Sequence, residues 1–270
     1  MLYIVGTPIG NLKDITYRAI ETLKSVDEIA CEDTRHTLKL LNAYDIKKPL
    51  FSYHKFNEKS AGERLIEKLK EGKNVALVTD AGMPLISDPG NLLVKQLVES
   101  NQPFTVVPGP SAFVCGLIMS GLLDYRFIFV GFLPEKNAER KKLLESYKNF
   151  DAPLVFYCAP HDVENTVKSI YKHFGNRKAC AVREITKAFE QREEFMLEDG
   201  YQGEKRGEFV LIVEGASETK KEFEMSVNEH IDMFINQGMS KKEAIKAVAK
   251  ERGVCKNDIY KYTVSEEQND

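Results

Sequence analysis

The chain has no cysteines at the spacing that metal sites or dithiol redox centres use. Its five cysteines lie far apart and mostly within apolar segments, at Cys31, Cys115, Cys158, Cys180 and Cys255. Because no CxxC pair occurs, the sequence predicts neither a zinc site nor a redox pair. Separate thiols of this kind are typical of a reducing compartment, so we expect a cytoplasmic protein.

Long apolar runs are missing as well. No run reaches the roughly 18 residues that a membrane-spanning helix needs, and the chain enters a strand pattern at Leu2–Val5 without a basic signal region. We therefore expect no membrane association. Hydrophobic residues make up 43% of the chain and charged residues 29%, a composition typical of a soluble globular protein. Its 270 residues are enough for two domains.

The chain also lacks an excess of positive charge, since its formal net charge is −3. Contact with nucleic acid would therefore depend on a local basic patch. One such patch lies at 239–262, where seven Lys and Arg residues stand against three acids. After a polar linker at 216–224, the pattern predicts short helices, the last from 257–262, with Ser240 and Glu243 spaced as a capping box. Helices with local positive charge suit a phosphate backbone, although solvated helix faces give the same pattern.

The first half alternates short apolar runs with amphipathic patterns. Strands are expected at 2–5, 28–31, 51–54, 74–78 and 104–107, of which 51–54 reads as a short edge strand or a loop. Helices are expected after Asp14, which we predict as an N-cap, and at 60–71, 89–100 and 112–119. Because four of the strands end in loops of small or charged residues, the pattern predicts a parallel α/β layer. Such layers bind ligands at the carboxyl ends of their strands.

The stretch Val78–Gly90 (VTDAGMPLISDPG) is the strongest candidate for a ligand-binding loop. It follows a buried strand, and Gly82 permits positive φ or a close approach of the backbone to a ligand. Asp88 is predicted to cap the next helix, with Pro89 at the first helical position. An ordinary connection between a strand and a helix would have the same composition.

Three further loops fall on the same predicted edge. Gly6–Asn11 suits a nucleotide or phosphate, or simply a tight chain reversal, because it lacks both the Walker and the GxGxxG patterns. Glu32–His36 brings acids, a guanidinium and an imidazole together, although acids are common at helix N-termini for electrostatic reasons. Ser111 is a candidate N-cap whose neighbouring N–H groups could face a ligand.

A second α/β unit is expected from Tyr125 onward. Its strands are predicted at 127–132, 154–158, 178–183, 190–195 and 208–213, and its helices at 135–148 and 161–174. The later strands have no long helices between them, so we expect a mixed sheet. His161 reads as a helix cap rather than a catalyst, and the charged residues 183–187 read as edge protection or as the wall of a site.

Seven short segments, spread over almost the entire chain, carry a family resemblance. They are Val5–Leu12 (VGTPIGNL), Ala30–Arg35 (ACEDTR), Thr79–Gly90 (TDAGMPLISDPG), Pro108–Ala112 (PGPSA), Gly131–Pro134 (GFLP), Ala159–His161 (APH) and Glu184–Lys187 (EITK). Each is weak alone, but together and in this order the chain resembles the tetrapyrrole-methylase-type family of S-adenosylmethionine enzymes. The family usually has Ser at the position of Thr79 and Thr at that of Met83, where main-chain contacts are expected.

The resemblance implies two α/β domains with S-adenosylmethionine in the cleft between them, and a homodimer. It also implies a small helical C-terminal domain that helps to hold RNA. The expected boundaries are 1–118, 119–216 and 217–270. The implied cofactor contacts are Pro8, Asp80, Ala81, Gly82, Leu85, Ser111, Ala112, Tyr157, Cys158, Ala159 and Val210.

A narrower likeness, to family members that act on ribosomal RNA, implies a substrate. The implied reaction is 2′-O-methylation of a cytidine ribose in the decoding centre of 16S rRNA, free or in the assembled small subunit. A ribose hydroxyl loses its proton as the methyl bond forms, so a general base is sought among the acids. No metal is required, because the sulfonium is the electrophile.

Six residues are candidates for the catalytic roles. Glu32, Asp33, Asp88 and Glu184 are candidate bases, while Arg35 and Lys187 are candidates to hold a phosphate or stabilise the developing alkoxide. Two alternatives stay open on the sequence. One is a methyltransferase of the same fold that acts on a tetrapyrrole or a protein side chain, and the other is a non-catalytic RNA-binding scaffold.

Overall fold

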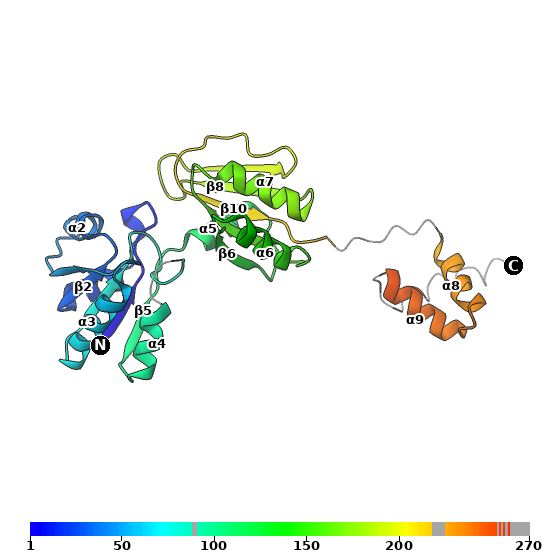
Figure 1. Ribbon diagram of the computed structural model, residues 1–270. Helices are drawn as coiled ribbons and strands as arrows, with labels where there is room; N and C mark the ends of the chain where they lie inside the picture. The colour runs from blue at the N-terminus through cyan, green and yellow to red at the C-terminus, as the bar shows by residue number, and fades with distance from the viewer. Residues whose placement is uncertain (88–90, 218–224, 253, 255, 257–258, 260–270) are drawn as a thin grey trace. The chain divides into compact units, whose positions relative to one another are not determined.

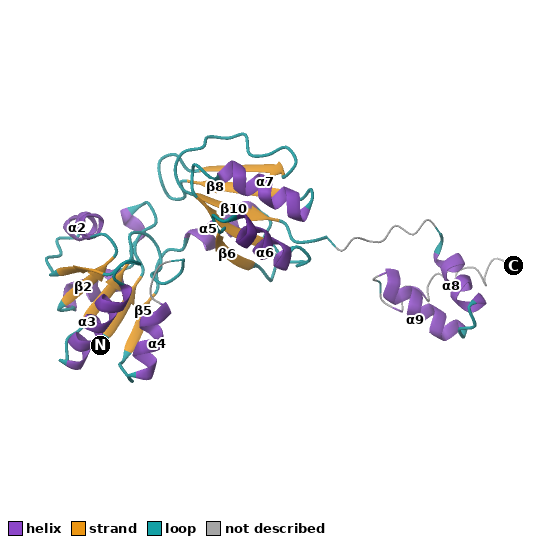
Figure 2. Cartoon of the chain, viewed as in Figure 1, coloured by secondary structure: helices purple, strands orange, loops and turns teal. Residues whose placement is uncertain are grey.

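The computed structural model describes residues 1–87, 91–217, 225–252, 254, 256 and 259 (Figure 1). Two compact units divide the chain, Met1–Gly215 and Ala216–Asp270. The first is an α/β unit with two five-stranded sheets, and the described part of the second is helical (Figure 2). None of the helices in the described ranges has the length and apolar character needed to cross a membrane.

The first sheet is entirely parallel, as predicted. Its strands are β1 (Leu2–Val5), β2 (Glu28–Cys31), β3 (Leu50–Ser52), β4 (Val75–Val78) and β5 (Phe104–Val107), in the order β3-β2-β4-β1-β5. The edge strand β3 ends at Ser52, so Tyr53 and His54 belong to the loop that follows. Because all five strands run the same way, their carboxyl ends form one edge, where a parallel sheet holds its ligands.

Helices cover both faces of this sheet. They are α1 (Tyr17–Ser25), α2 (Thr34–Ala43), α3 (Glu58–Lys70) and α4 (Asn91–Glu99), preceded by the 3-10 turn η1 (Leu12–Asp14). Buried side chains of α1 and α2 pack with one face of the strands, and those of α3 and α4 pack with the other. The alternation of side chains along each strand makes both faces apolar, which is typical of a parallel sheet.

The N-cap predicted at Asp14 is wrong. Asp14 lies inside η1, whose own cap is Asn11, and Ile15 then leaves the turn in an extended conformation. The Thr16 hydroxyl instead accepts a hydrogen bond from the Ala19 N–H at 3.1 Å and so caps α1. The predicted cap Asp88 and its neighbour Pro89 lie outside the described residues.

The second sheet is mixed, as predicted. Its strands are β6 (Ile128–Phe132), β7 (Leu154–Cys158), β8 (Lys178–Arg183), β9 (Gln191–Met196) and β10 (Phe209–Val213), in the order β6-β7-β10-β8-β9. Only β6 and β7 pair in parallel, while β10 and β8 are antiparallel to their neighbours. The helices are α5 (Ala112–Ser120), α6 (Asn137–Tyr147) and α7 (Val163–Phe174). Asp162, not His161, holds the N-cap position of α7.

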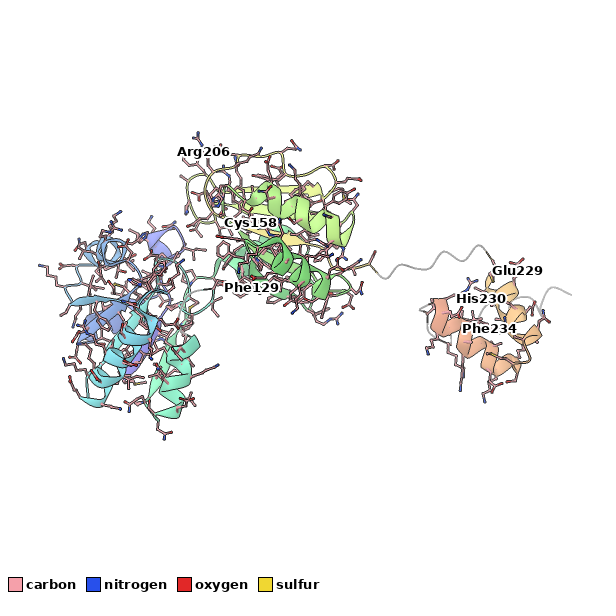
Figure 3. All side chains as sticks on the ribbon, viewed as in Figure 1. Phe129, Cys158, Arg206, Glu229, His230 and Phe234 are labelled. Carbon is pink, nitrogen blue, oxygen red and sulfur yellow. The ribbon has the colours of Figure 1, made fainter. Side chains whose placement is uncertain are left out.

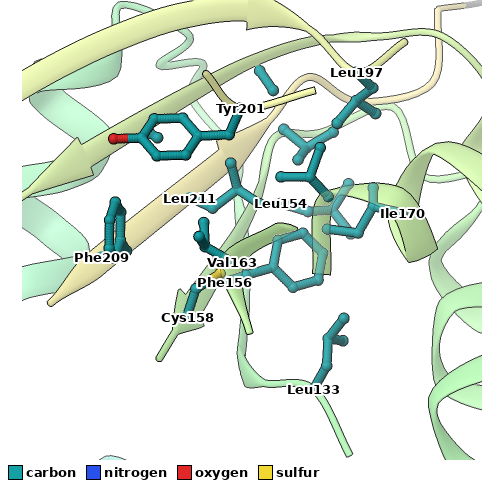
Figure 4. Close-up of a cluster of buried hydrophobic side chains, with 14 of the residues drawn as sticks. Leu133, Leu154, Phe156, Cys158, Val163, Ile170, Leu197, Tyr201, Phe209 and Leu211 are labelled. Atoms are coloured by element: carbon teal, nitrogen blue, oxygen red, sulfur yellow. The ribbon is translucent and has the colours of Figure 1, made fainter. Parts of the chain in front are cut away.

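Two buried clusters hold the second sheet between its helices. Leu144 of α6 and Ile170 of α7 share one cluster with Phe156 of β7, shown in Figure 4. On the other face, Leu117 of α5 clusters with the central strands, and Ile9 from the loop after β1 joins the same cluster. Each such side chain contributes about 1.5–3 kcal/mol when fully buried. The loop after β1 therefore shares core packing with the second sheet.

The helical unit is built from α8 (Val227–Asn236) and α9 (Lys241–Arg252). The predicted capping box forms, with Glu243 N–H donating to Ser240 Oγ at 3.4 Å and Ser240 N–H donating to Glu243 Oε2 at 3.1 Å. His230 is buried on α8, one turn before Phe234 (Figure 3), and its Nδ1 accepts from Arg252 Nε at 3.1 Å. Arg252 thereby ties the end of α9 to the start of α8. Of the helix predicted at 257–262, only Ile259 lies within the described residues.

Candidate active site

A pocket of about 390 Å³ opens at the carboxyl edge of the first sheet and is closed on its far side by the second sheet. Its volume is within the range of about 300–1,000 Å³ that small-molecule sites occupy. Its wall from the first half comprises Ile9, Glu32, Thr79, Asp80, Ala81, Gly82, Met83, Ile86, Ser87, Ser111 and Ala112. Its wall from the second half comprises Phe132, Tyr157, Cys158, Ala159, Pro160, Ile185, Glu208, Phe209 and Val210.

The loop after β4 is locked to the loop after β1. Thr7 N–H donates to Gly82 O at 2.9 Å, and Gly82 N–H donates to Thr7 O at 3.2 Å. The buried Thr7 hydroxyl also donates toward Thr79 O at 3.2 Å. Gly82 has φ +80°, the left-handed conformation that glycine adopts without strain. The positive φ predicted for Gly82 is thus present, and a pocket lies beside it.

Two glycines let the loops after β1 and β5 touch. A Cβ built on Gly109 would lie 2.9 Å from Gly6 Cα and 3.0 Å from Gly6 C, which are backbone atoms that cannot rotate away. Because β1 and β5 are neighbours in the sheet, this contact sets how closely the Ser111–Ala112 wall approaches the rest of the pocket.

Gly109→Ala should therefore push the Pro108–Ala112 loop outward and lower cofactor affinity at least about tenfold, with about 1–3 kcal/mol lost from the free energy of unfolding. Calorimetric titration with S-adenosylhomocysteine, the demethylated form of the cofactor that the sequence resemblance implies, and thermal unfolding check both effects. Gly62→Ala is the matched control, because its Cβ would meet only side-chain atoms, the nearest being Gln96 Oε1 at 3.2 Å. Unchanged affinity in Gly109→Ala would show that the loop contact does not shape the pocket.

The second half contributes an apolar and aromatic wall. The Tyr157 ring lies edge-on to Phe129 at 5.1 Å between centroids and tilted against Phe132 at 5.4 Å. Burial raises the pKa of the Cys158 thiol to about 12, so this side chain is neutral and acts as part of the apolar lining. Cys158 and Phe129 are labelled in Figure 3.

Glu32 directly follows β2, and it forms part of the pocket wall. The Thr79 hydroxyl donates to Glu32 Oε2 at 3.1 Å, which fixes the carboxylate. Its second oxygen has no hydrogen-bond partner among the residues that the structure describes. Asp80, the second acid of this wall, accepts from the Asp33 N–H at 3.3 Å. A polar atom with spare capacity in a pocket wall is where a ligand hydroxyl can bind.

Asp33 and Arg35 lie outside the pocket wall. Asp33 caps α2, and its carboxylate accepts from Arg35 Nε at 3.1 Å and from Arg35 Nη2 at 2.7 Å. The hydrogen bonds from Arg35 hold the pKa of the Asp33 carboxyl well below its usual range. A carboxylate held in this way is a poor proton acceptor at neutral pH.

Glu184 and Lys187 form a charged cluster beside the pocket. Lys187 Nζ donates to Glu184 Oε1 and to Glu208 Oε2, each at 2.9 Å, and Glu208 N–H donates to Glu184 Oε1 at 2.9 Å. Burial opposes ionisation of Glu184, but these donors outweigh it and lower the pKa of the carboxyl. The same two carboxylates raise the pKa of Lys187 against the effect of its burial. Both groups are therefore charged and mutually satisfied.

The segment 184–187, which carries Glu184 and Lys187, has an unusual backbone conformation. Glu184 has φ +51° and Thr186 has φ +67°. Thr186 N–H donates to Glu190 Oε2 at 2.6 Å, and the Thr186 hydroxyl accepts from Asn11 N–H at 3.1 Å. Positive φ in residues other than glycine is costly and persists only where the surroundings enforce it. These bonds bring Ile185 into the pocket wall and tie it to the loop after β1.

The sequence-predicted residues divide into three groups. The pocket wall includes Asp80, Ala81, Gly82, Ser111, Ala112, Tyr157, Cys158, Ala159, Val210 and Glu32. Pro8, Leu85, Asp33, Arg35, Glu184 and Lys187 are not in the wall, and Asp88 lies outside the described residues. Phe132, Ile185 and Glu208 line the pocket without having been predicted. The first two belong to the GFLP and EITK segments, whereas no pattern in the sequence singled out Glu208.

This chain is similar to known proteins in both sequence and fold. The sequence profile of the tetrapyrrole (corrin/porphyrin) methylases matches residues 1–199. The chain belongs to the tetrapyrrole methylase family. Within the described residues of this tetrapyrrole methylase, no group of three or more His, Cys, Asp or Glu side chains is arranged to hold a metal ion.

Two relatives are similar over nearly their whole length. Ribosomal RNA small subunit methyltransferase I of Bacillus subtilis is 43% identical over 96% of this chain and 92% of its own. The enzyme of the same name from Halalkalibacterium halodurans is 46% identical over 96% of this chain and 93% of its own.

A solved structure shares the fold. Uroporphyrin-III C-methyltransferase from Thermus thermophilus, solved in complex with S-adenyl homocysteine, superimposes with a TM-score of 0.57. The match covers 78% of this tetrapyrrole methylase and 96% of that chain, at 17% sequence identity. The two-sheet α/β architecture is therefore that of tetrapyrrole methylases.

Proposed function

We propose that this protein transfers a methyl group from S-adenosylmethionine to the 2′-oxygen of a cytidine ribose in 16S rRNA of the small ribosomal subunit. The observation that carries the proposal is the likeness to ribosomal RNA small subunit methyltransferases I over 96% of this chain. That likeness extends through the basic helical unit, which the family profile at residues 1–199 does not include. The pocket supplies a place for the cofactor.

The pocket fits S-adenosylmethionine in its chemistry as well as in its volume. The carboxylates of Glu32 and Asp80 complement a cationic ligand, while Val210 and the Tyr157 ring provide apolar surface. Backbone groups at Asp80–Gly82 and at Ser111–Ala112 border the pocket, where hydrogen bonds can orient a polar ligand. When bound, the cofactor supplies an electrophilic methyl group.

Glu32 is our candidate for the proton acceptor. Its carboxylate is in the pocket wall, and the Thr79 hydroxyl holds Oε2 so that Oε1 can accept the ribose 2′-hydroxyl proton. General bases in such positions contribute typically 10²–10⁴-fold. Holding the hydroxyl in line with the methyl group contributes several kcal/mol more, about 7–11 in favourable cases.

The other candidate residues are assigned supporting roles. Glu184 and Glu208 hold Lys187 beside the pocket, where its ammonium can stabilise developing negative charge on the ribose oxygen. Arg35 is exposed next to the pocket-forming end of β2, so its free guanidinium edge suits a phosphate of the substrate. Asp33 orients Arg35 through their paired hydrogen bonds.

The helical domain, which we place at 217–270, is assigned to RNA. Lys242, Lys246 and Lys250 are exposed and follow one another at intervals of four residues on α9, so they form one stripe. Ile245 and Val248 are buried on the opposite side against α8. A stripe of lysines on a rigid helix suits the regularly spaced charges of a phosphate backbone.

An exposed apolar surface on α5 supports a homodimer. Ile118 is 62% exposed and Val114 41% exposed, one turn apart on the side of α5 that faces away from the second sheet. Leu123, Tyr125 and Phe127 are also exposed in the segment that follows. Exposed apolar side chains gathered in this way are typical of an interface between proteins.

Ile118→Asp should convert the dimer to a monomer, because it places a charge in the centre of this surface. Light scattering on the eluting protein measures the mass. Val98→Asp, which replaces another exposed apolar side chain on α4, is the control and should leave the dimer intact. A wild-type protein that elutes as a monomer would remove the homodimer from the proposal.

The proposed function is tested in cells that lack this protein. Loss of one ribose methylation on a cytidine of 16S rRNA, restored by the wild-type gene, is the expected result. A 16S rRNA with an unchanged pattern would exclude it and favour a tetrapyrrole or protein substrate. Titration with S-adenosylmethionine then separates an enzyme from a silent scaffold, which need not bind it. We expect the protein in the cytoplasm, where its RNA substrate is made.

A further inference from the structure

The loop Tyr53–Asn57, after β3, carries an aromatic side chain that its surroundings do not bury. Phe56 is 85% exposed. Its ring has the His54 ring edge-on at 6.0 Å and the Lys55 ammonium at 4.9 Å from its centroid. An isolated exposed apolar residue is common on protein surfaces and needs no explanation by itself. Phe56 differs from such a residue in the turn that carries it, in its position near the proposed active site and in the surface hollow beside it.

Asn57 fixes the conformation of this loop. Its side-chain oxygen accepts from His54 N–H at 2.8 Å, and its side-chain amide donates to Ser52 O at 3.0 Å. Asn57 N–H also donates to His54 O at 3.0 Å. Three hydrogen bonds close this turn and fix the backbone that carries Phe56, so a ligand that contacts the ring does not have to order the loop.

The loop begins next to the proposed active site. Tyr53 N–H donates to Cys31 O at 2.8 Å, and Cys31 immediately precedes Glu32. Neighbouring strands are about 4.7–4.9 Å apart, and Phe56 is three residues beyond Tyr53, at most about 11 Å of extended chain. The ring is therefore close enough to meet a nucleotide adjacent to the one whose ribose reaches Glu32.

A surface hollow of about 420 Å³ adjoins the ring, bordered by Phe56 and by Leu92 at the start of α4. Lys55 and Lys59 border it together with Glu58 and Glu63, so its positive and negative charges balance. A hollow without net positive charge is poorly suited to a phosphate, but an aromatic ring at its border suits the uncharged face of a base. Proteins recognise RNA largely by stacking unpaired bases on such rings.

We propose that Phe56 is a stacking platform for an unpaired base of the small-subunit RNA next to the target cytidine. Lys55 places a cation over the ring, 4.9 Å from its centroid, and the Asn57 turn holds the loop of the platform in place. This inference rests on the proposed function and names a substrate-positioning residue for it. Phe56 takes no part in cofactor binding, because it lies outside the pocket wall.

The test uses the full-length protein with small ribosomal subunits from cells that lack it. Phe56→Ala should raise KM for subunits about tenfold, since base–aromatic stacking is worth roughly 1–3 kcal/mol per base. Its kcat and its affinity for S-adenosylmethionine should stay at wild-type values. Phe56→Tyr should restore KM because it keeps the ring, whereas Phe56→Leu should behave like Phe56→Ala. Phe150→Ala is the control, an exposed phenylalanine before the amino end of β7.

The salt dependence of KM distinguishes base stacking from electrostatic binding. Stacking releases no counterions, so the ratio of KM between Phe56→Ala and wild type should be the same at 50 and 200 mM salt. Three results would each contradict the stacking role of Phe56: an unchanged KM in Phe56→Ala, a wild-type KM in Phe56→Leu, or a loss of cofactor affinity in Phe56→Ala as large as its rise in KM. Failure of the wild-type protein to methylate subunits would instead refute the proposed function, so the two outcomes are distinct.

Discussion

Glu32→Gln should reduce kcat for methyl transfer about 10²–10⁴-fold, the usual contribution of a general base. The amide keeps the shape of the side chain and can still accept the hydrogen bond that Thr79 donates to Glu32 Oε2. It can no longer accept the ribose proton. Because the change leaves the pocket walls in place, affinity for S-adenosylhomocysteine should stay near the wild-type value. Single-turnover transfer and calorimetric titration measure the two quantities separately.

Two further variants decide which acid acts. Glu21→Gln, an exposed residue of α1, is the matched control and should be silent. Asp33→Asn should have a smaller effect than Glu32→Gln, since Asp33 lies outside the pocket wall and bonds to Arg35. Wild-type transfer by Glu32→Gln would remove Glu32 from this role. A larger loss in Asp33→Asn would move the role to the neighbouring carboxylate.

Reversing the lysine stripe of α9 is expected to have the second large effect. The triple variant Lys242→Glu, Lys246→Glu, Lys250→Glu replaces three attractive contacts with repulsive ones. Each contact to single-stranded RNA contributes about 0.7 to the slope of log affinity against log salt. The variant should therefore bind small subunits with a slope shallower by about 2 and an affinity at least about a hundredfold lower at 50 mM salt. Filter binding over a salt series measures both.

The control for the stripe reverses three lysines on the second sheet's helices. Lys141, Lys142 and Lys168 are exposed on α6 and α7, so their triple replacement by Glu changes net charge equally. It should have a much smaller effect on affinity and slope. Equal losses in both variants would mean that overall charge, and not the stripe on α9, controls RNA binding. Cofactor affinity should be unchanged in both.

Local patterns predicted the fold of the first unit well, for a physical reason. Runs such as Val75–Val78 are buried on both faces, and a fully buried parallel strand must be apolar throughout. The loops that follow such strands necessarily meet at one edge, so Gly82 and Ser111 were predictable as residues of a pocket at that edge. The cap of α1 was not, because Asp14 and Thr16 are both good caps, and the choice depends on η1 before them.

The residues of the pocket that patterns missed depend on distant contacts. Glu208 borders the pocket because β10 pairs with both β7 and β8, an arrangement that no local signal specifies. Lys187 was a candidate in the sequence, but its pairing with Glu184 and the distant Glu208 beside the pocket follows only from the tertiary structure. Phe56 follows no motif, and only its exposure and the turn at Asn57 single it out. Side-chain environments of this kind follow from tertiary packing, which the linear pattern does not encode.

The most direct measurement combines the purified full-length protein, S-adenosylmethionine labelled on its methyl group, and small subunits from cells lacking the protein. After transfer, digestion of the 16S rRNA to nucleosides locates the label. We expect stoichiometric label in 2′-O-methylcytidine, and loss of that label in Glu32→Gln. Label on a base, on a ribosomal protein or on nothing at all would contradict it.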